Sequence, residues 1–445
     1  MNSIFLRANN NLLKASLVML SIFVYQINLA FAQSVSSIIK VEYRLGLNLN
    51  DAELQHARLS ISADTRYRIN RNWSIYLDLR GEAADDDVGL GTVNTYSSLS
   101  KPLLDGKHTR FEVDRAFVQW RERAHTLTLG KQVTPWGVLD GIQITDRFDP
   151  VRRRDFVLTD VRPERIARWG ARWRNTLGKF KLDASFALDG TVSQQAEINR
   201  LFFTHSTRFT GGINLSSTPI AMIAEQRNTS LEQSTFGMRA SRPLGSGELS
   251  LLTFRGPDTD PLLTLVQQPL INQPARVALT YQRRTLYGAT YDLSLGETVL
   301  RGEIAYIPDQ SINIISEIPL QSARAKRLLA GVGLDWNAPA QWFVNGQLAI
   351  DYVNGEDFSL VRPATDIILT LRAQRTFING RLLFKGELIG TLNEKDGVLR
   401  PELAYDYSDR LKLRSGIDYL FGDENSQFGQ FRDNSRFWFA ATYTF

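Results

Sequence analysis

The sequence predicts an all-β protein: a transmembrane antiparallel β-barrel of about eighteen strands, with sixteen as the alternative, joined by short periplasmic turns and long extracellular loops. Three observations carry this prediction. Apolar and polar residues alternate with period two along most of the chain, short and long connections alternate between these runs, and the final run ends on the aromatic residue Phe445.

The alternation is clear from the first run. Val41, Tyr43 and Leu45 share one face, and Glu42 and Arg44 lie on the other. A soluble β-sandwich alternates in the same way, with its apolar face turned inward. Run length separates the two folds, because many runs here have ~9–11 residues, the length of a tilted strand that crosses a membrane.

Eighteen runs qualify as strands. We expect them at residues 40–50, 57–69, 73–82, 109–121, 125–132, 165–175, 179–189, 233–242, 247–256, 276–294, 298–307, 326–336, 341–352, 366–376, 381–392, 398–407, 411–420 and 436–445.

Two kinds of connection alternate between these runs. Tight turns lie near 70–72, 122–124, 176–178, 243–246, 295–297, 337–340, 377–380 and 408–410. The other set is mostly longer and polar, at 83–108, 133–164, 190–232, 257–275, 308–325, 353–365 and 421–435, with short exceptions at 51–56 and 393–397. This asymmetry is typical of outer-membrane barrels, and it places both chain ends in the periplasm.

Aromatic residues support the same topology. Tryptophans near the tight turns indicate a periplasmic girdle: Trp73, Trp120, Trp173, Trp336 and Trp342. In the last run Tyr443 and Phe445 face the same way, a pattern that resembles the C-terminal signal read by the barrel-insertion machinery. The terminal strand must also pair with the first, because an open edge in lipid leaves backbone groups unsatisfied.

The N-terminus predicts export. Arg7 and Lys14 precede an apolar run, and Ala30-Phe31-Ala32 has the small-residue pattern of a cleavage site. We therefore expect a signal peptide at 1–32 and an outer-membrane barrel at 33–445, located in the outer membrane of a Gram-negative bacterium. Outer-membrane lipid and lipopolysaccharide are then its surroundings.

Composition argues against several classes of protein. Removing residues 1–32 lowers the formal charge from +5 by the two basic residues Arg7 and Lys14, so no nucleic acid is expected as a partner. The chain has no cysteine, hence no disulfides. Its four histidines are scattered and have neither metal-site spacing nor a partnered serine motif, so we expect no enzyme, no metal and no cofactor.

If the apolar faces meet lipid, the polar faces line the lumen. Carboxylates share those faces with the basic residues, and pairing across strands accounts for most of them. The basic residues expected in the lumen are Arg44, Arg58, Arg66, Arg68, Arg80, Arg168, Arg172, Arg174, Lys181, Arg327, Arg372, Arg381, Lys385, Arg400, Lys412 and Arg414.

One stretch departs from charge balance. Between Arg147 and Arg174 basic residues outnumber acidic ones, and a basic cluster in a water-filled passage attracts anions. The alternatives are binding of lipopolysaccharide phosphates at the outer rim and pairing with loop carboxylates. The candidate pore residues are Arg147, Arg152, Arg153, Arg154, Arg162, Arg168, Arg172 and Arg174.

A motif in the same region resembles alginate-export-type porins and a related group of proteobacterial barrels. It comprises Gly130, Gln132, Trp136, Gly137, Asp140, Gly141, Asp146, Pro150, Asp155 and Phe156. The resemblance covers about forty residues and implies an eighteen-stranded, monomeric barrel. In the alginate branch it also implies an arginine-rich selectivity zone for an acidic polysaccharide.

These observations leave two functional hypotheses. The first is a channel or export porin that passes anionic or saccharide-like solutes through an arginine-rich lumen. The second is a barrel plugged by its long loops that serves as an envelope-complex component, a receptor or an outer-membrane enzyme. The loop at 190–232 is long enough to fold inward, and it contains the apolar piece Leu201-Phe202-Phe203.

Overall fold

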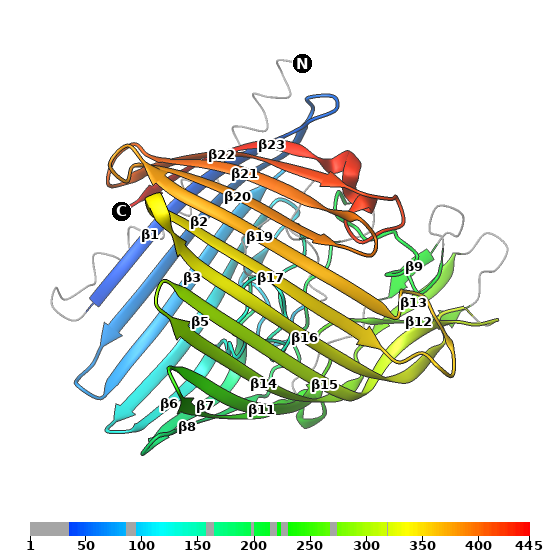
Figure 1. Cartoon of the computed structure of the whole chain (residues 1–445), viewed down its shortest axis with the longest axis horizontal. Helices are drawn as coiled ribbons and strands as arrows, with labels where there is room; N and C mark the ends of the chain where they lie inside the picture. Colours follow the sequence, from blue (N-terminus) through cyan, green and yellow to red (C-terminus); the bar gives the residue numbers. More distant parts are fainter. Residues whose placement is uncertain are drawn as a thin grey trace.

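Eighteen antiparallel strands close into one barrel (Figure 1). The computed structural model describes residues 35–85, 95–156, 164–196, 200–213, 220–223, 230–267, 274–317 and 319–445. The barrel strands are β1 (Val35–Asn48), β2 (Leu54–Arg68), β3 (Trp73–Ala84), β5 (Thr109–Glu122), β6 (His125–Gln132), β7 (Arg168–Leu177), β8 (Phe180–Ala187), β10 (Thr235–Leu244), β11 (Gly247–Pro257), β14 (Arg283–Leu295), β15 (Thr298–Ile315), β16 (Ser322–Ala338), β17 (Trp342–Val353), β19 (Thr365–Phe377), β20 (Leu382–Thr391), β21 (Asp396–Asp406), β22 (Leu411–Phe421) and β23 (Arg436–Thr444).

Each barrel strand pairs with its neighbours in chain order, and the last strand closes the ring on the first. β1 and β23 pair antiparallel from Lys40 opposite Thr444 to Asn48 opposite Arg436. Closure satisfies the backbone N–H and C=O groups that an open edge would leave bare in lipid. The predicted closed barrel of eighteen strands is therefore confirmed.

Two predicted boundaries were wrong. The run 276–294 is not one strand, because it breaks after Thr280, and its first part leaves the barrel as β13 (Ala275–Thr280). The expected loop 308–325 is largely strand, because β15 and β16 stay paired as far as Asn313 opposite Ser322.

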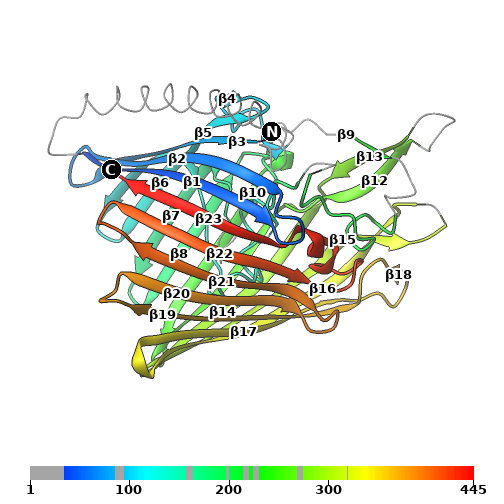
Figure 2. The ribbon, with the colours of Figure 1, turned by 90° about the horizontal axis from the view of Figure 1, so that it is seen from above.

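The long connections lie at one end of the barrel, and the short turns lie at the other (Figures 1 and 2). We call the end with the short turns the periplasmic end. At the opposite end β9 (Ile220–Ile223), β12 (Leu262–Gln267) and β13 form a separate three-stranded sheet. The short strands β4 (Leu104–Asp105) and β18 (Ser359–Leu360) and the 3₁₀ turns η2 (Leu231–Gln233), η3 (Pro339–Gln341) and η4 (Gly429–Asn434) complete the described elements.

The outer surface of the barrel is apolar. Leu251, Val332 and Ile350 point away from the lumen and are 60%, 62% and 44% exposed. Trp73 and Trp173 are also exposed beside short turns, as a membrane girdle requires. Among the described residues, no helix is long and apolar enough to cross a membrane. The expected signal peptide, residues 1–32, lies outside the described residues.

Candidate functional site

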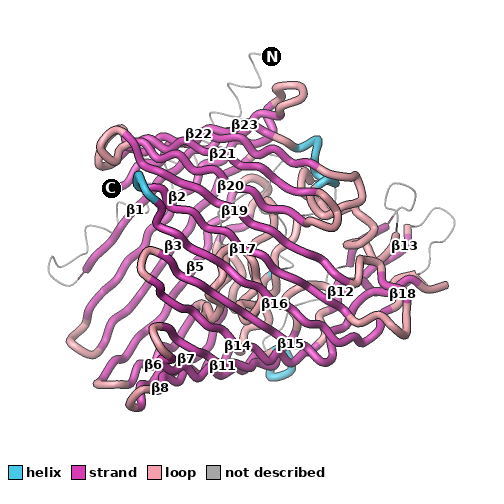
Figure 3. The backbone as a smooth tube through the Cα atoms, in the orientation of Figure 1, coloured by secondary structure: helices cyan, strands magenta, loops and turns pink. Residues whose placement is uncertain are grey.

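A loop from the extracellular side folds into the barrel. Residues 133–156, here called the inserted loop, follow β6 and lie inside the ring of strands (Figure 3). Its apolar side chains pack against apolar residues on the inner wall. The buried cluster consists of Trp136, Leu139, Ile142, Ile144, Phe148, Ala187, Leu252, Phe254, Leu286, Ala305, Ile307, Leu329 and Ala349. The inner wall is thus apolar where this loop covers it, a departure from the expected polar lining.

The carboxylate of Glu303 on β15 anchors the inserted loop. One of its oxygens accepts hydrogen bonds from the backbone N–H groups of Val138 and Leu139. The other accepts the N–H of Thr145 at 2.9 Å and its hydroxyl at 2.6 Å. These donors would otherwise be buried without partners, so the wall carboxylate fixes the path of the loop.

Asp140 makes a second set of anchors on the same wall. Its backbone N–H donates to the Gln347 Oε1 at 3.0 Å, and the Gln347 amide returns a bond to the Asp140 carbonyl at 2.6 Å. Its carboxylate lies 3.5 Å from the guanidinium groups of both Arg301 and Arg372. The loop is therefore tied to β15, β17 and β19.

The far end of the inserted loop reaches the opposite wall. Asp155 accepts two hydrogen bonds from Arg58 on β2, at 2.7 and 3.1 Å. Arg154 donates to Glu82 on β3 at 3.1 Å. Because β2 and β3 face β15 and β17 across the closed ring of eighteen strands, the inserted loop crosses the lumen.

The motif residues build this crossing. The Trp136 indole N–H donates to Asp183 on β8 at 3.1 Å, and Asp146 accepts the Trp136 backbone N–H at 3.2 Å. Gly137 is required by space, because an added Cβ would lie 2.7 Å from the Asp146 Cβ and 3.1 Å from Glu303 Oε1. Gly141 has a φ of +80°, which favours glycine.

The remaining motif residues lie at the two ends of the loop. Gly130 and Gln132 belong to β6, and the Gln132 amide donates to the Thr128 carbonyl at 3.1 Å. The Pro150 carbonyl accepts the Ile166 N–H at 2.8 Å, and the ring of Phe156 lies 4.9 Å from that of Phe431.

A second segment also packs at the extracellular mouth. Phe202 joins Val398, Leu420, Phe428 and Phe431 in a buried cluster on the inner faces of β21 and β22. The expectation that the loop 190–232 folds inward through Leu201-Phe202-Phe203 is met at Phe202. Farther along the same predicted loop, Ile220–Ile223 forms β9 of the extracellular sheet.

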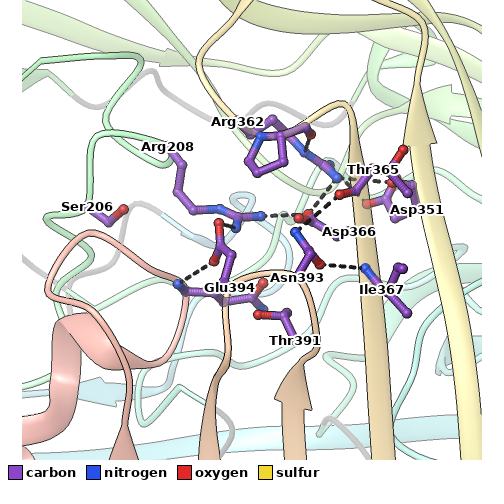
Figure 4. A network of polar contacts seen from close by, with 12 residues as sticks. Ser206, Arg208, Asp351, Arg362, Thr365, Asp366, Ile367, Thr391, Asn393 and Glu394 are labelled. Atoms are coloured by element: carbon purple, nitrogen blue, oxygen red, sulfur yellow. Dashed lines mark hydrogen bonds and ion pairs between the residues drawn. The ribbon is translucent and has the colours of Figure 1, made fainter.

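An ionic network fastens this second segment (Figure 4). Arg208 bridges Asp366 at 2.7 Å and Glu394 at 2.6 Å. Arg362 binds the same Asp366 oxygen at 2.6 Å and also contacts Asp351 at 3.0 Å. The side chains of Arg208 and Asp366 are both buried, so removing either one would leave the other as an uncompensated buried charge.

Most of the predicted pore arginines are engaged with the protein. Arg152 meets Glu112, Asp114 and the Tyr96 hydroxyl at 2.8 to 3.0 Å. Arg153 binds Asp260 at 3.0 Å, and Arg147 lies 3.8 Å from the same carboxylate.

The arginines on and beside β7 divide into two kinds. Arg168 is buried and donates to the Phe148 carbonyl at 2.5 Å and to the Thr235 hydroxyl at 3.0 Å. Arg172 pairs with Asp183 at 2.5 Å. Arg174 faces the lumen, is exposed, and has no ion pair among the described residues. Arg162 lies outside the described residues.

Arg174 belongs to a set of four lumen-facing arginines without a carboxylate partner. The others are Arg66 and Arg68 on β2 and Arg121 on β5, all exposed, and within the described part of the chain none of the four forms an ion pair. All four lie near short turns, in the periplasmic half of the lumen. Sequence reasoning missed Arg121, because the run 109–121 is mixed on both faces.

Elsewhere on the lumen wall, arginines are paired with carboxylates. Arg400 lies between two carboxylates, 3.1 Å from Glu387 and 3.0 Å from Asp418. Arg436 also pairs with Asp418, at 2.8 Å. Arg327 pairs with Asp351 at 2.6 Å. Cross-strand pairing, expected for most lumen charges, is thus the rule from which the four arginines depart.

Arg121 and Arg174 lie at the same level of the lumen wall. Register places Arg121 opposite Thr126 on β6, and Thr126 opposite Arg174 on β7. The two arginines are therefore separated by two strand spacings, about 10 Å between backbones. Asp183, the register neighbour of Arg174, is already occupied by Arg172 and Trp136.

Two carboxyls of the inserted loop have shifted acidities. Burial raises the pKa of Asp149 to about 6, although the Arg168 guanidinium and the Thr134 N–H act in the other direction. Burial also acts to raise the pKa of Asp155, but Arg58 and Arg154 outweigh it and hold that pKa well below its usual range.

The histidines do not converge. His56 is buried beside Arg436, and His125 stacks on the ring of Trp173 at 6.1 Å. His205 lies beside Phe431, and His108 contacts the Ala84 carbonyl at 3.2 Å. In the described ranges, no group of three or more histidine or carboxylate side chains is arranged to hold a metal ion.

Comparison with known proteins gives likeness in fold alone. No protein-family model matches the chain, and no curated protein matches it. Among solved structures, Acinetobacter baumannii OccAB3 is 10% identical with a TM-score of 0.49, covering 93% of this chain and 98% of that one. Acinetobacter baumannii OccAB2 is 11% identical with a TM-score of 0.49 (93% and 97%), and Salmonella typhi OmpF in complex with daunomycin is 9% identical with a TM-score of 0.42 (92% and 97%).

The closed ring and its apolar outer surface place the chain in a membrane. With no open edge and with large apolar side chains facing outward, the barrel satisfies its backbone internally, as a hydrocarbon environment demands. Even-numbered antiparallel barrels with short turns at one end and long loops at the other are the outer-membrane type. The chain is an outer-membrane β-barrel.

Proposed function

We propose that this barrel is a passive channel that prefers small anionic or saccharide-like solutes. The observation that carries the proposal is the set of four exposed lumen arginines, Arg66, Arg68, Arg121 and Arg174, without carboxylate partners. Unpaired like charges that share one region of the lumen wall repel one another unless an anion or water compensates them. A barrel of this strand number encloses room for an aqueous passage.

The site of selectivity in this proposal differs from the one that the sequence suggested. Most arginines of the 147–174 stretch hold the inserted loop and its surroundings in place. The free positive charge lies below that loop, toward the periplasmic end. The resemblance to alginate-export-type porins makes an acidic polysaccharide a candidate solute, since its carboxylates match guanidinium groups.

Reversal potentials across planar bilayers in a KCl gradient test the proposal. The wild-type barrel is expected to favour chloride, and the double variant Arg121→Gln, Arg174→Gln to lose most of that preference. The matched control is Arg242→Gln, Arg375→Gln, because both arginines lie on the outward face of their strands. Cation selectivity in the wild type, or an equal loss in the control, contradicts the proposal.

A closed barrel is the second candidate, and one observation favours it. The inserted loop crosses the lumen, and the neighbouring residues 189–196 are joined to it by the Arg153 N–H, which donates to the Gln194 carbonyl at 2.8 Å. A barrel that gives no conductance at any voltage would support this candidate, which would then act through its extracellular loops as a receptor, an envelope-complex component or an enzyme.

A further inference from the structure

Three lumen-facing side chains form a continuous stack in the periplasmic half of the barrel. Arg66, Tyr76 and Phe117 are directly opposite one another on β2, β3 and β5. The rings of Tyr76 and Phe117 are 4.6 Å apart and only 18° from parallel. The Arg66 guanidinium carbon lies 5.1 Å from the centre of the Tyr76 ring. The stack therefore begins with a cation and ends with the ring of Phe117.

Within the described strands, the register positions beyond Phe117 carry no ring that would continue the stack. The residue opposite Phe117 on β6 is Gly130, and the residue opposite Gly130 on β7 is Gly170. The Gln132 amide lies against the wall here, donating to the carbonyls of Thr128 and Gly170 at 3.1 and 3.5 Å. Neighbouring strands are about 4.8 Å apart, close to a stacking distance, so a further planar ring matches the repeat of the stack.

A guanidinium that makes no ion pair with any described residue lies within reach of that position. Phe117, Gln119 and Arg121 occupy successive lumen-facing positions of β5, and Arg121 donates to Gln119 Oε1 at 3.4 Å. The Arg121 head group is thus turned toward Phe117. Arg121 lies two lumen-facing steps, about 14 Å, from Phe117, but its head group lies beside Gln119, one step or about 7 Å from Phe117. That span fits a ring on Phe117 with a directly attached carboxylate that meets Arg121.

We propose that the periplasmic half of the lumen holds a binding site for aromatic carboxylates, with the ring on Phe117 and the carboxylate on Arg121 and Arg174. The proposal rests on the channel function in placing the ligand in the lumen, and it names a solute class for it. Phe117 sets the preference for flat ligands, and the two arginines set the preference for anions.

Isothermal titration calorimetry of the full barrel in detergent tests the site. It uses three probes: benzoate, cyclohexanecarboxylate and glucuronate. Benzoate and cyclohexanecarboxylate have the same charge, but only benzoate is planar. We expect benzoate to bind about tenfold more tightly than cyclohexanecarboxylate, the upper range for one aromatic contact. Equal binding overturns the proposal, and glucuronate binding as tightly as benzoate assigns the site to acidic sugars instead.

Variants separate the ring from the charge. Phe117→Leu is expected to abolish the preference for benzoate while chloride selectivity stays unchanged, and Arg121→Gln to weaken all three probes. The matched control is Phe343→Leu, since Phe343 also carries a guanidinium, that of Arg372, 5.6 Å from its ring centre, on another part of the wall. If Phe117→Leu fails to fold, Tyr76→Leu, which removes the ring behind Phe117, is expected to lower the preference. A preference that survives in the folded variants overturns the site.

Titration and reversal potentials on the same preparation keep the two proposals apart. Benzoate preference in a barrel without anion selectivity removes the channel function and leaves the site. Anion selectivity without a preference for benzoate removes the aromatic binding site and leaves the channel function.

Discussion

The carboxylate of Glu303 holds Thr145 through two hydrogen bonds, from its backbone N–H at 2.9 Å and from its hydroxyl at 2.6 Å. Glu303 belongs to the barrel wall, and Thr145 belongs to the loop that crosses the lumen. The other carboxylate oxygen takes the N–H groups of Val138 and Leu139. One wall side chain therefore binds both arms of the loop, and this makes it the strongest single target for loosening the crossing.

Glu303→Gln is expected to free the inserted loop without unfolding the barrel. The amide turns one acceptor oxygen into a donor, so buried donors of the loop lose their partner at about 1–3 kcal/mol. Planar-bilayer recordings should show larger and noisier currents than those of the wild type. Glu248→Gln is the control, because Glu248 faces the lumen and pairs with Lys181 but has no bond to the loop. Identical currents in wild type and Glu303→Gln would contradict the anchoring role.

Gly137→Ala is expected to loosen the same segment by crowding. The new methyl group would lie 2.7 Å from the Asp146 Cβ, and a Cβ atom cannot retreat without moving the backbone. Overpacking of this kind costs about 1–3 kcal/mol. Hydrogen exchange of residues 133–148 should accelerate by about tenfold or more.

Gly302→Ala is the matched control, because a Cβ there meets nothing closer than the Gly331 carbonyl at 4.0 Å. If both alanine variants exchange at the same rate as the wild type, the crowding argument fails.

The strands were predictable because each depends on its own residues. Alternation and turn residues can be recognised within a single stretch of sequence. Because side chains alternate with period two, the apolar residues of a strand determine which of its faces meets lipid. The run 276–294 shows the limit, because alternation continues across the break after Thr280 although β13 belongs to another sheet. Alternation does not tell a strand in the barrel from one that stands beyond its rim.

The site was less predictable because it depends on contacts between distant residues. Leu252, Phe254 and Leu286 face the lumen, and only the insertion of Trp136 and Phe148 explains why an inner wall is apolar there. The same insertion determines which arginines are paired. The sequence shows the basic stretch at 147–174, but it does not show which carboxylates neutralise these arginines.

Arg208→Ala is expected to release the segment at residues 200–213, which packs at the extracellular mouth through Phe202. Both Asp366 and Glu394 contact Arg208, and removing one partner of a buried ion pair costs about 3–5 kcal/mol. The chain has no cysteine, so a single Ser206→Cys substitution provides a unique thiol at a fully buried position. Its labelling by a water-soluble thiol reagent should accelerate on the order of a hundredfold when Arg208 is also replaced.

The control for this labelling is Arg324→Ala in the same Ser206→Cys background. Arg324 makes an exposed ion pair with Asp309 at 3.4 Å, and exposed pairs contribute little. Equal labelling rates with and without Arg208 would show that the segment is held by its apolar contacts alone.

The inserted loop is expected to pack more firmly at pH 5 than at pH 7.5. Burial raises the pKa of Asp149 to about 6, so the proton binds more tightly in the packed loop than in water, where the usual value is 3.8. The stability that this group contributes is therefore complete below about pH 4 and is lost as pH rises through 6. Between pH 7.5 and pH 5 the equilibrium between the packed and the loosened loop should shift by about tenfold toward the packed state.

Asp155 does not contribute to the change in loop packing between pH 5 and pH 7.5. Its pKa is lowered, so it stays ionised from pH 5 to 7.5, and its contribution is lost only in stronger acid. Hydrogen exchange of residues 133–150 from pH 5 to 8, corrected for the intrinsic rate, measures the step. Asp149→Asn should abolish it and Asp309→Asn should preserve it, because Asp309 makes an exposed ion pair with Arg324. A step that persists in Asp149→Asn, or one of opposite sign, would mean that another group controls the packing.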